Sequence, residues 1–429
     1  MSMRGPHRKK VSAFALLLEL AVVMVLLSAP TVVSAGVPIG SRFVVSNNNG
    51  WPEVNPAIAY NTQRQEYLVV WYNDRAGCDD IQAQRVSRGG TLVGSPFFIA
   101  ATCPDERRYP DVAYDSTHDQ YLVVWEQGID VKAKLISATG AGLTLEFTVA
   151  AGYPTLDSAS NPHVAYASTS DQYLVIWQYS GTAGSSIDAQ VYEYNGAPNG
   201  SSFDVIPYRF YASESPPEEP DLAYNRSRNE FLVAWQQEPP GGDYDIYGQR
   251  VKLTGGAGVQ GSAFPVATSG TDETNPAVAA IPTVPNAGQY LVAWEKGTDV
   301  EARTVSGVGT TGTLRSLAST GWTEHSPAVA GCESTQQFLA VWVWIPVVTP
   351  PAMMQVQART LALDGTLVDD TTNAGGGQVF AADVAAGPTG DVLVAFDDNA
   401  TIGTSNRGIY GRLWGHRVYF PVVMRSYTP

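Results

Sequence analysis

The sequence has few charged residues, and basic residues are the scarcer kind. Charged residues make up 16% of the 429 residues, with 26 Lys and Arg against 41 Asp and Glu, which gives a formal net charge of -15. A nucleic-acid-binding protein needs a basic surface facing the phosphates. We therefore exclude nucleic acid as a partner and expect a soluble acidic protein that attracts cationic groups.

Motifs that identify common enzymes and metal sites are also missing. There is no Gly-x-Ser-x-Gly nucleophile turn, no contiguous Asp-x-Asn-x-Asp-Gly calcium loop and no Ser-x-Asp-x-Gly-x-x-Trp sialidase box. The five histidines do not gather into a zinc-ligand pattern. They are His7, His118, His163, His325 and His416. No catalytic chemistry follows from motifs alone.

What the sequence does contain is one pattern repeated seven times. Each copy has Pro-x-Val-Ala-Tyr or a close variant, a short polar turn, and Tyr-Leu-Val-Val-Trp or a close variant. The copies span residues 56–71, 110–125, 162–177, 220–235, 276–294, 327–342 and, in eroded form, 383–396. The closing aromatic residue recurs about every 50 to 60 residues, a period typical of propellers and repeat arrays.

Each repeat is expected to form four short strands. In the first repeat the apolar runs cover residues 57–60, 67–71, 81–86 and 97–100. Gly-containing turns separate the third and fourth runs, and the leading proline suits an innermost edge strand. Outside the N-terminus no stretch has a convincing helical period. The prediction is an all-β, seven-bladed β-propeller.

The two ends of the pattern predict how the ring closes. The seventh repeat has only three strands, over residues 383–386, 392–396 and 409–413, whereas residues 41–46 before the first repeat match the pattern of a fourth strand. An N-terminal strand that completes the last blade would remove the open end of the ring. A linear array would not need this permutation.

A small residue also recurs on the third strand of every repeat. We interpret it as space for the large Trp of a neighbouring strand or blade. The positions are Ala83, Ala133, Ala189, Gly248, Ala302, Ala358 and Gly411.

The first 35 residues differ from the rest of the chain. Basic residues at positions 4–10 precede an apolar run over 13–27, and Ala35 offers a cleavage position. We expect a secretory signal peptide over 1–35, a propeller over 36–415 and a tail over 416–429. An uncleaved membrane anchor is the alternative, although Glu19 and Pro30 count against it. The tail faintly resembles short C-terminal tails of exported bacterial proteins, or forms a strand against the last blade.

The repeat resembles a unit of large secreted bacterial surface proteins. In that unit a Trp-ended strand precedes an Ile-Tyr-Gly-Gln-Arg segment and a Gly-containing hairpin. The best copy here is Trp235 followed by residues 245–251, and residues 409–412 are an eroded copy. The resemblance implies a secreted or cell-surface binding module and transfers no catalytic residue.

The predicted topology gathers acidic residues on one end of the ring, which we call the acidic face. It consists of the loops that lead into each first strand and those that follow each Trp. These loops hold thirteen and twelve acidic residues, more than half of the chain's 41. Asp111, Asp221 and Asp383 are expected nearest the axis, where hard oxygen ligands suit Ca²⁺. The alternative is that such residues only cap turns and begin strands.

Other ligand contacts are expected from residues that break the repeat. His163 occupies the position equivalent to Asp111, and Trp51, Trp322 and Tyr109 lie in loops of the acidic face. The repeated Trp residues themselves indicate blade packing, because a binding site requires asymmetry.

The three cysteines are too few for a fold built on disulfides. Cys78 and Cys103 lie in loops on the same face of adjacent repeats, so a bridge between them is one reading. Three free thiols, including Cys332, are the other.

The sequence favours a monomeric exported binding module whose acidic face takes a cation, a glycan or a basic protein partner. The alternative is a carbohydrate-active hydrolase or lyase with paired carboxylates in the axial cleft. A membrane enters only if the N-terminal segment stays uncleaved.

Overall fold

The computed structural model describes residues 36–46, 50–75, 77–152, 157–181, 184–209, 216–253, 256–281, 289–346, 354–399 and 407–416. The predicted signal segment 1–35 and the tail from residue 417 lie outside the described residues. No helix long and apolar enough to cross a membrane occurs among the residues described.

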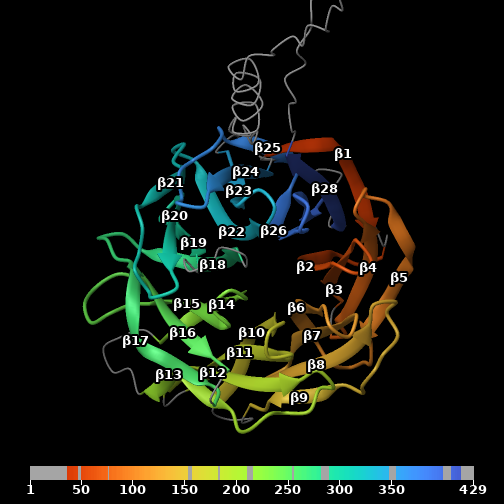
Figure 1. The fold of residues 1–429 in the computed structure, drawn as a ribbon. Coiled ribbons are helices and arrows are strands. Elements are labelled where there is room, and N and C mark those ends of the chain that lie inside the picture. Colours follow the sequence, from red (N-terminus) through yellow and green to blue (C-terminus); the bar gives the residue numbers. More distant parts are fainter. Residues whose placement is uncertain are drawn as a thin grey trace, which may run out of the picture. The chain divides into compact units, whose positions relative to one another are not determined.

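The described strands form seven four-stranded antiparallel sheets, which are the blades of a propeller (Figure 1). Blade 1 contains β2 (Glu53–Asn61), β3 (Glu66–Asn73), β4 (Asp80–Ser87) and β5 (Leu92–Ala100). Blade 2 contains β6 (Arg107–Asp115), β7 (Gln120–Gln127), β8 (Asp130–Ser137) and β9 (Phe147–Ala150). Blade 3 contains β10 (Asp157–Ala167), β11 (Gln172–Gly181), β12 (Gly184–Glu193) and β13 (Phe203–Arg209).

The remaining blades repeat this order. Blade 4 contains β14 (Glu218–Asn225), β15 (Glu230–Gln237), β16 (Asp245–Lys252) and β17 (Gly258–Ala267). Blade 5 contains β18 (Glu273–Ile281), β19 (Gln289–Lys296), β20 (Asp299–Ser306) and β21 (Arg315–Ala318). Blade 6 contains β22 (Thr323–Cys332), β23 (Gln337–Ile345), β24 (Gln355–Ala362) and β25 (Thr372–Gly375). Blade 7 contains β26 (Val379–Ala386), β27 (Asp391–Asp398), β28 (Gly408–His416) and β1 (Gly36–Ser46).

The predicted closure is confirmed. Strand β1 pairs with β28 in antiparallel register, with Phe43 opposite Gly411, Val44 opposite Tyr410 and Gly36 opposite His416. A Cβ atom on Gly411 would lie 2.6 Å from the Phe43 ring. The absence of a side chain at Gly411 is therefore what lets the N-terminal strand seat its aromatic residue.

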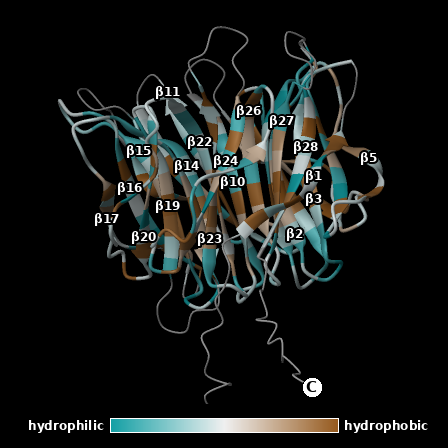
Figure 2. Cartoon of the chain, turned by 90° about the horizontal axis from the view of Figure 1, so that it is seen from above, coloured by the Kyte–Doolittle hydropathy of each residue, from teal (hydrophilic) through white to brown (hydrophobic). Residues whose placement is uncertain are grey.

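The core lies between the blades, and the repeated aromatic residues fill it. Trp71, Trp125, Trp294 and Trp342 are 0% exposed. Trp125 of β7 packs in one cluster with Val70 and Ala83 of the preceding blade. Figure 2 shows the hydrophobic segments along the strands and hydrophilic residues in the loops at both ends. The repeated Trp residues are thus packing residues between blades.

The recurrent small residue of the third strand lies in one cluster with the Trp of the next blade, as we expected, for example Ala83 with Trp125. It also faces a residue of the fourth strand. Ala83, Gly248 and Gly411 lie opposite Phe97, Phe264 and Phe43 of the fourth strand. A Cβ atom on Gly248 would lie 3.0 Å from the Phe264 ring. The small side chain therefore leaves room for this Phe of the fourth strand as well as for the Trp of the next blade.

Candidate functional site at the axis of the ring

The innermost strands share a kinked backbone at the acidic face. In six blades the residue before the conserved proline has a left-handed φ between 47° and 51°. These residues are Asn55, Tyr109, Asn161, Glu219, Asn275 and Ser326. Such φ values are uncommon for residues other than glycine and need support from the surrounding structure.

That support comes from the preceding blade. The residue after the repeated Trp accepts a hydrogen bond from the backbone N–H of the kinked residue in the next blade. Glu126 Oε1 accepts from Asn161 N at 2.6 Å, and Glu295 Oε1 accepts from Ser326 N at 2.7 Å. Gln236 Oε1 accepts from Asn275 N at 2.8 Å. These side chains hold neighbouring blades together.

Sequence reasoning missed this role, although it left a signal. An Asp, Glu or Gln follows the aromatic residue in five repeats, at Glu126, Gln178, Gln236, Glu295 and Asp397. We counted the three acidic ones only as charge on the acidic face. A polar side chain that recurs directly after the repeated aromatic residue could have indicated a hydrogen bond made in the same way between each pair of blades.

One residue beyond each proline, the inner strands line an axial cavity of about 460 Å³. Four of the predicted site residues occupy this position, Asp111, His163, Asp221 and Asp383, and a fifth, Tyr109, lines the cavity two residues before Asp111. The equivalent positions in the other three blades are Ala57, Ala277 and Ala328. The cavity wall is therefore polar at four blades, and at the other three the small alanine side chains leave more space.

Each axial aspartate also ties its blade to the next one. Asp111 accepts from Val112 N and, at 2.8 Å, from Val164 N of blade 3. Asp221 accepts from Leu222 N and, at 2.6 Å, from Val278 N of blade 5. Asp383 accepts from Ile58 N of blade 1 at 2.8 Å. The carboxylates are positioned by two blades and still face the cavity.

His163 lies between two of these carboxylates. Its Nδ1 is 3.5 Å from Asp111 Oδ2 and 3.5 Å from Asp221 Oδ1, and its side chain is 36% exposed to the cavity. Burial lowers the pKa of His163, but the contact with Asp111 and the charge of Asp221 outweigh it and raise the pKa to about 9. The His163 ring thus lies between two of the three aspartates that we named as possible Ca²⁺ ligands.

Within the described part of the chain, Asp383 is the axial aspartate that forms no ion pair, since His163 pairs with Asp111 and Asp221. Burial, with the charges of Asp111 and Asp221, raises the pKa of Asp383 to about 7. Among the described lining residues, four acidic side chains, Asp111, Glu219, Asp221 and Asp383, thus line the cavity with one basic side chain, His163. Because the pKa of Asp383 is raised, a cation beside it would favour loss of its proton.

A pH dependence of stability follows from these pKa values. Folded Asp383 binds a proton that the unfolded chain releases at its ordinary value of 3.8, so ionisation costs stability as pH rises from 3.8 to about 7. His163 contributes stability that is lost as pH rises from 6.5 to about 9.

We expect Asp383→Asn to remove the loss of stability that occurs between pH 3.8 and about 7. Urea unfolding of the wild type and of the variant, at pH values from 4 to 9, would measure it. The difference between the two proteins should grow between pH 4 and 7 and level off above. A difference independent of pH would contradict the assignment.

The predicted aromatic contacts are spread over the acidic face. Tyr109 is 44% exposed, borders the axial cavity and meets Tyr72 edge to face at 5.9 Å. Trp51 is 46% exposed, with the Arg75 guanidinium 6.0 Å from its ring centre. Trp322 is partly exposed in the loop before β22. Of the three, Tyr109 is among the cavity-lining residues.

Many acidic residues of this face are engaged inside the protein. Eight of those that we assigned to it are buried: Glu53, Asp79, Asp80, Asp245, Glu273, Glu324, Asp397 and Asp398. Glu53 accepts a hydrogen bond from Ser46 Oγ at 2.7 Å. These residues contribute charge to the face but are not available for direct contact with a large partner.

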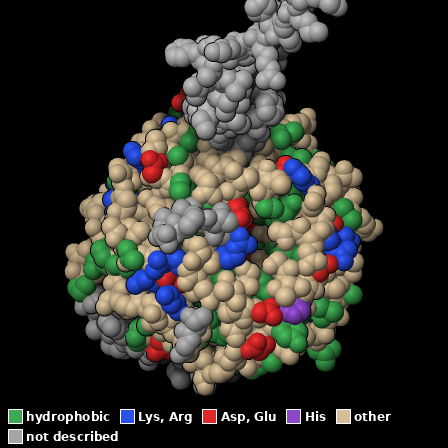
Figure 3. Space-filling view, in the orientation of Figure 1, with side chains coloured by type: hydrophobic (Ala, Val, Ile, Leu, Met, Phe, Trp, Pro, Cys, Tyr) green, Lys and Arg blue, Asp and Glu red, His purple; other side chains and the backbone are tan. Residues whose placement is uncertain are grey.

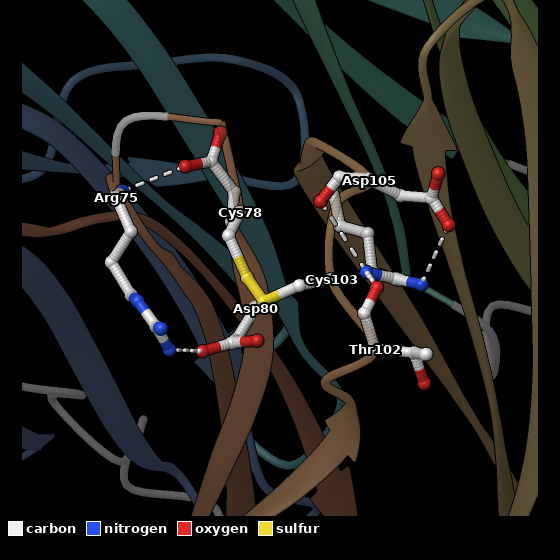
Figure 4. The surroundings of a disulfide bond; sticks show 8 residues. Arg75, Cys78, Asp80, Thr102, Cys103 and Asp105 are labelled. Atoms are coloured by element: carbon white, nitrogen blue, oxygen red, sulfur yellow. Dashed lines mark hydrogen bonds and ion pairs between the residues drawn. A yellow bond between two sulfur atoms is a disulfide. The ribbon is translucent and has the colours of Figure 1, made fainter.

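A disulfide joins Cys78 and Cys103, whose Cα atoms are 5.0 Å apart (Figure 4). Cys332 is buried and takes no part in this disulfide. The bridge ties the loop after β3 to the connection between blades 1 and 2. Next to it Arg75 Nη1 contacts Asp80 Oδ2 at 2.5 Å, as Figure 4 shows. The acidic residues at this junction are thus neutralised within the protein.

On the opposite end of the ring, a second group of potential ligands occurs. Asp115, His118 and Asp171 have ligand atoms within 4.8 Å of one another, and His118 Nδ1 lies 2.9 Å from Asp115 Oδ2 and 3.4 Å from Asp171 Oδ1. In blade 1, Arg64 occupies the position of His118 and pairs with Asp119 of blade 2 at 2.8 Å. We interpret His118 as the same blade-to-blade contact.

Basic and acidic side chains are mixed on the surface that Figure 3 shows, which looks onto one end of the ring. Ion pairs also join different blades. Arg226 pairs with Glu333 at 3.0 Å, and Arg88 pairs with Asp391.

Comparison with known proteins places the fold. No family model and no curated protein matches the chain. A fungal alcohol oxidase of the AA5 family, solved in complex with copper, is similar over 88% of this chain and 76% of its own, with 12% identity and a TM-score of 0.51.

Two archaeal structures are similar at lower scores. The β-propeller domain of the Trilobed protease from Pyrococcus furiosus matches over 86% of this chain and 94% of its own, with 7% identity and a TM-score of 0.48. Pyrococcus horikoshii acylaminoacyl peptidase matches over 86% and 52%, with 9% identity and a TM-score of 0.47. At these identities the similarity concerns the fold alone, and the seven closed blades define this chain as a β-propeller.

Proposed function

We propose that this protein is an exported binding module whose axial cavity takes one positively charged side chain, a lysine or an arginine, of a protein partner. The observation that carries the proposal is the cavity itself. It is lined by Asp111, Asp221 and Asp383, and His163 is the one basic side chain among its described lining residues. Its size, about 460 Å³, falls within the range of ligand sites.

The arrangement of the wall favours a ligand beside Asp383. Ala57 and Ala328 of the two flanking blades leave space there, whereas His163 takes up the space between Asp111 and Asp221. A cation at this place would lower the raised pKa of Asp383, so binding would be coupled to loss of its proton. Tyr109 at the rim offers an exposed ring to the rest of the ligand.

The location outside the cell is part of the same proposal. It is supported by the signal-like residues 1–35 and by the resemblance of the repeat to secreted bacterial surface proteins. The propeller closes on itself through β1, which supports a monomer.

Peptide binding tests this function. The probe is a fluorescent peptide of alternating glycine and arginine, and its anisotropy is measured at pH 7.5 over a range of salt concentrations. We expect Asp383→Asn to weaken binding by about tenfold, because a desolvated charge pair is lost. The matched control is Asp364→Asn, which removes the same charge from an exposed hairpin at the other end of the ring. Equal weakening by both variants would show that only net charge matters and would contradict the axial site.

One observation favours a second function, a carbohydrate-active hydrolase. A carboxyl group with a pKa of about 7 beside two further carboxylates is what glycosidases use as a general acid. Against this, each axial carboxylate already accepts a hydrogen bond from a backbone N–H group of the next blade, which gives it a structural role. Release of nitrophenol from a panel of nitrophenyl glycosides, present in the wild type and abolished by Asp383→Asn, would establish the enzyme instead of the binding module.

A further inference from the structure

Blades 4 and 7 have a tyrosine on the third strand that stacks on the repeated aromatic residue. In blade 4, Tyr247 of β16 stacks on Trp235 of β15, with ring centres 6.0 Å apart and ring planes 23° apart. In blade 7, Tyr410 of β28 stacks on Phe396 of β27 at 6.2 Å and 19°. In the other five blades this position of the third strand is not aromatic and holds Gln82, Lys132, Asp188, Glu301 and Gln357. Blades 4 and 7 can therefore be compared directly.

In blade 7 an arginine of the chain itself lies over the tyrosine. The guanidinium carbon of Arg42, from β1, is 4.8 Å from the centre of the Tyr410 ring. The same guanidinium forms an ion pair with Asp398, which is 0% exposed. A guanidinium is planar and only weakly hydrated, so both the aromatic ring and the carboxylate attract it. Blade 7 thus shows which group this arrangement accepts.

At the position of this arginine, blade 4 has a cavity. In both blades the fourth strand places a Phe, Phe264 or Phe43, opposite the Gly that follows the tyrosine. The residue before that Phe is Arg42 in blade 7 and Ala263 in blade 4. Ala263 lines a cavity of about 400 Å³, which we call the blade 4 cavity and whose size falls within the range of ligand sites.

The wall of the blade 4 cavity suits an arginine side chain. Tyr247 and Trp235 provide aromatic rings, as their counterparts do beside Arg42. The rest of the wall is largely apolar and offers surface to the methylene groups of an arginine. It includes Pro207 of β13 and Pro239 and Pro240 of the loop after β15.

Two polar residues beside the blade 4 cavity take the place of Asp398. In blade 7, Asp398 lies opposite Gly408 in the sheet, and in blade 4 the same two positions hold Gln237 and Asp245. Gln237 lines the cavity, and its Oε1 accepts from the indole N–H of the stacked Trp at 3.3 Å and has a second lone pair for a ligand. Asp245 Oδ2 accepts from the tyrosine hydroxyl at 3.3 Å. Burial raises the pKa of Asp245, and a cation nearby would favour its ionised form.

We propose that the blade 4 cavity binds an arginine side chain of a protein partner, with its guanidinium over Tyr247 as that of Arg42 lies over Tyr410. Gln237 accepts a hydrogen bond from this guanidinium, and Asp245 provides the negative charge. Arginine is expected rather than lysine, because a planar guanidinium stacks on a ring whereas an ammonium is a strongly hydrated point charge. This site does not rest on the axial cavity, which takes either side chain.

Photocrosslinking of a peptide tests the proposal. The probe is a short glycine peptide that contains one arginine and, next to it, a photoreactive diazirine amino acid. Equilibrium dialysis at pH 7.5 counts the bound peptides per chain, and mass spectrometry identifies the crosslinked residues. We expect crosslinks within residues 237–241 or 258–264. Replacing the arginine by citrulline, its neutral isostere, should weaken binding at this cavity by about tenfold, and replacing it by lysine should weaken binding by about threefold.

Ala263→Arg should fill the cavity from within, because it places an arginine at the position that Arg42 has in blade 7. We expect the blade 4 crosslinks to disappear and the number of bound peptides per chain to fall accordingly. The matched control is Ser202→Arg, which should keep these crosslinks. Ser202 is exposed, as Ala263 is, and has the same place in blade 3 before Phe203, so this variant adds the same charge where the third strand has Asp188.

A second variant tests the stacking itself. Tyr247→Leu keeps an apolar side chain and should weaken binding at the blade 4 cavity by about three- to tenfold. An unchanged affinity would contradict a guanidinium over the ring.

The proposal fails if the wild type gives no crosslinks in blade 4, or if these crosslinks persist in Ala263→Arg. It also fails if the citrulline peptide binds equally well, because the cavity then takes a neutral group such as a sugar. Asp383→Asn should leave the blade 4 crosslinks in place. Failure of the axial site and failure of the blade 4 cavity are therefore separate results.

Discussion

A chain that begins at residue 47 will not form a stable propeller. Without β1, strand β28 becomes an exposed edge. The core also loses two side chains, Phe43, which packs on Gly411, and Val45, which is 1% exposed in the folded protein. Burial of each such side chain is worth about 1.5–3 kcal/mol. With the lost ladder hydrogen bonds, the cost of about 5 kcal/mol or more approaches the whole stability of a typical domain. We expect aggregation or a broad transition in thermal unfolding followed by circular dichroism.

The control for this deletion is a chain that begins at residue 36. It retains β1 and should unfold in one cooperative transition. Adding a synthetic peptide of residues 36–46 to the shorter chain should restore part of the lost melting temperature, because an exposed strand edge accepts an added strand. A shorter chain that melts at the same temperature as its control would show that the seventh blade is stable with three strands.

Asp397→Ala, at the end of β27 in the acidic face, should be strongly destabilising. Asp397 is 0% exposed, and its Oδ1 accepts from Phe380 N at 3.0 Å and Ala381 N at 2.8 Å. Its Oδ2 lies 3.4 Å from Arg407 Nη1. Removing the carboxylate leaves these buried donors and the guanidinium without their acceptor, at a cost of about 3–5 kcal/mol measured by urea unfolding.

Two further variants separate the hydrogen bonds from the charge. Burial raises the pKa of Asp397, so the neutral isostere in Asp397→Asn keeps an acceptor oxygen and should lose clearly less stability than Asp397→Ala. Asp364→Ala, in an exposed hairpin, removes one turn hydrogen bond from Thr366 N at 2.9 Å and should cost about 1 kcal/mol or less. If all three variants are equally stable, the contacts of Asp397 do not support the seventh blade.

The fold could be predicted because packing repeats along the chain. Trp71 and its counterparts recur at one spacing, and the fourth strand missing after residue 413 reappears before Trp51, so blade number and closure could be counted. The pairing of Phe43 with Gly411 belongs to the same pattern, since Phe97 and Phe264 lie opposite small residues in their own blades.

The site could be predicted only in part. Periodicity placed Asp111, His163, Asp221 and Asp383 around the axis, because equivalent positions in a ring converge. It could not show that His163 lies between two carboxylates, which depends on side-chain direction across blades. Nor could it separate Glu126, which supports a kinked backbone, from an acidic residue that faces a ligand. Composition shows the charge of a face, while the hydrogen-bond partners show how much of that charge is free.

The pairing of Gly36 with His416 also has a mechanical consequence. Gly36 begins β1 and His416 ends β28, and the two lie side by side. A force that pulls them apart would therefore break the hydrogen bonds between the two strands one after another. Strands loaded in shear would share the force among all their bonds at once. We therefore expect β1 and β28 to separate at a lower force than two strands loaded in shear would.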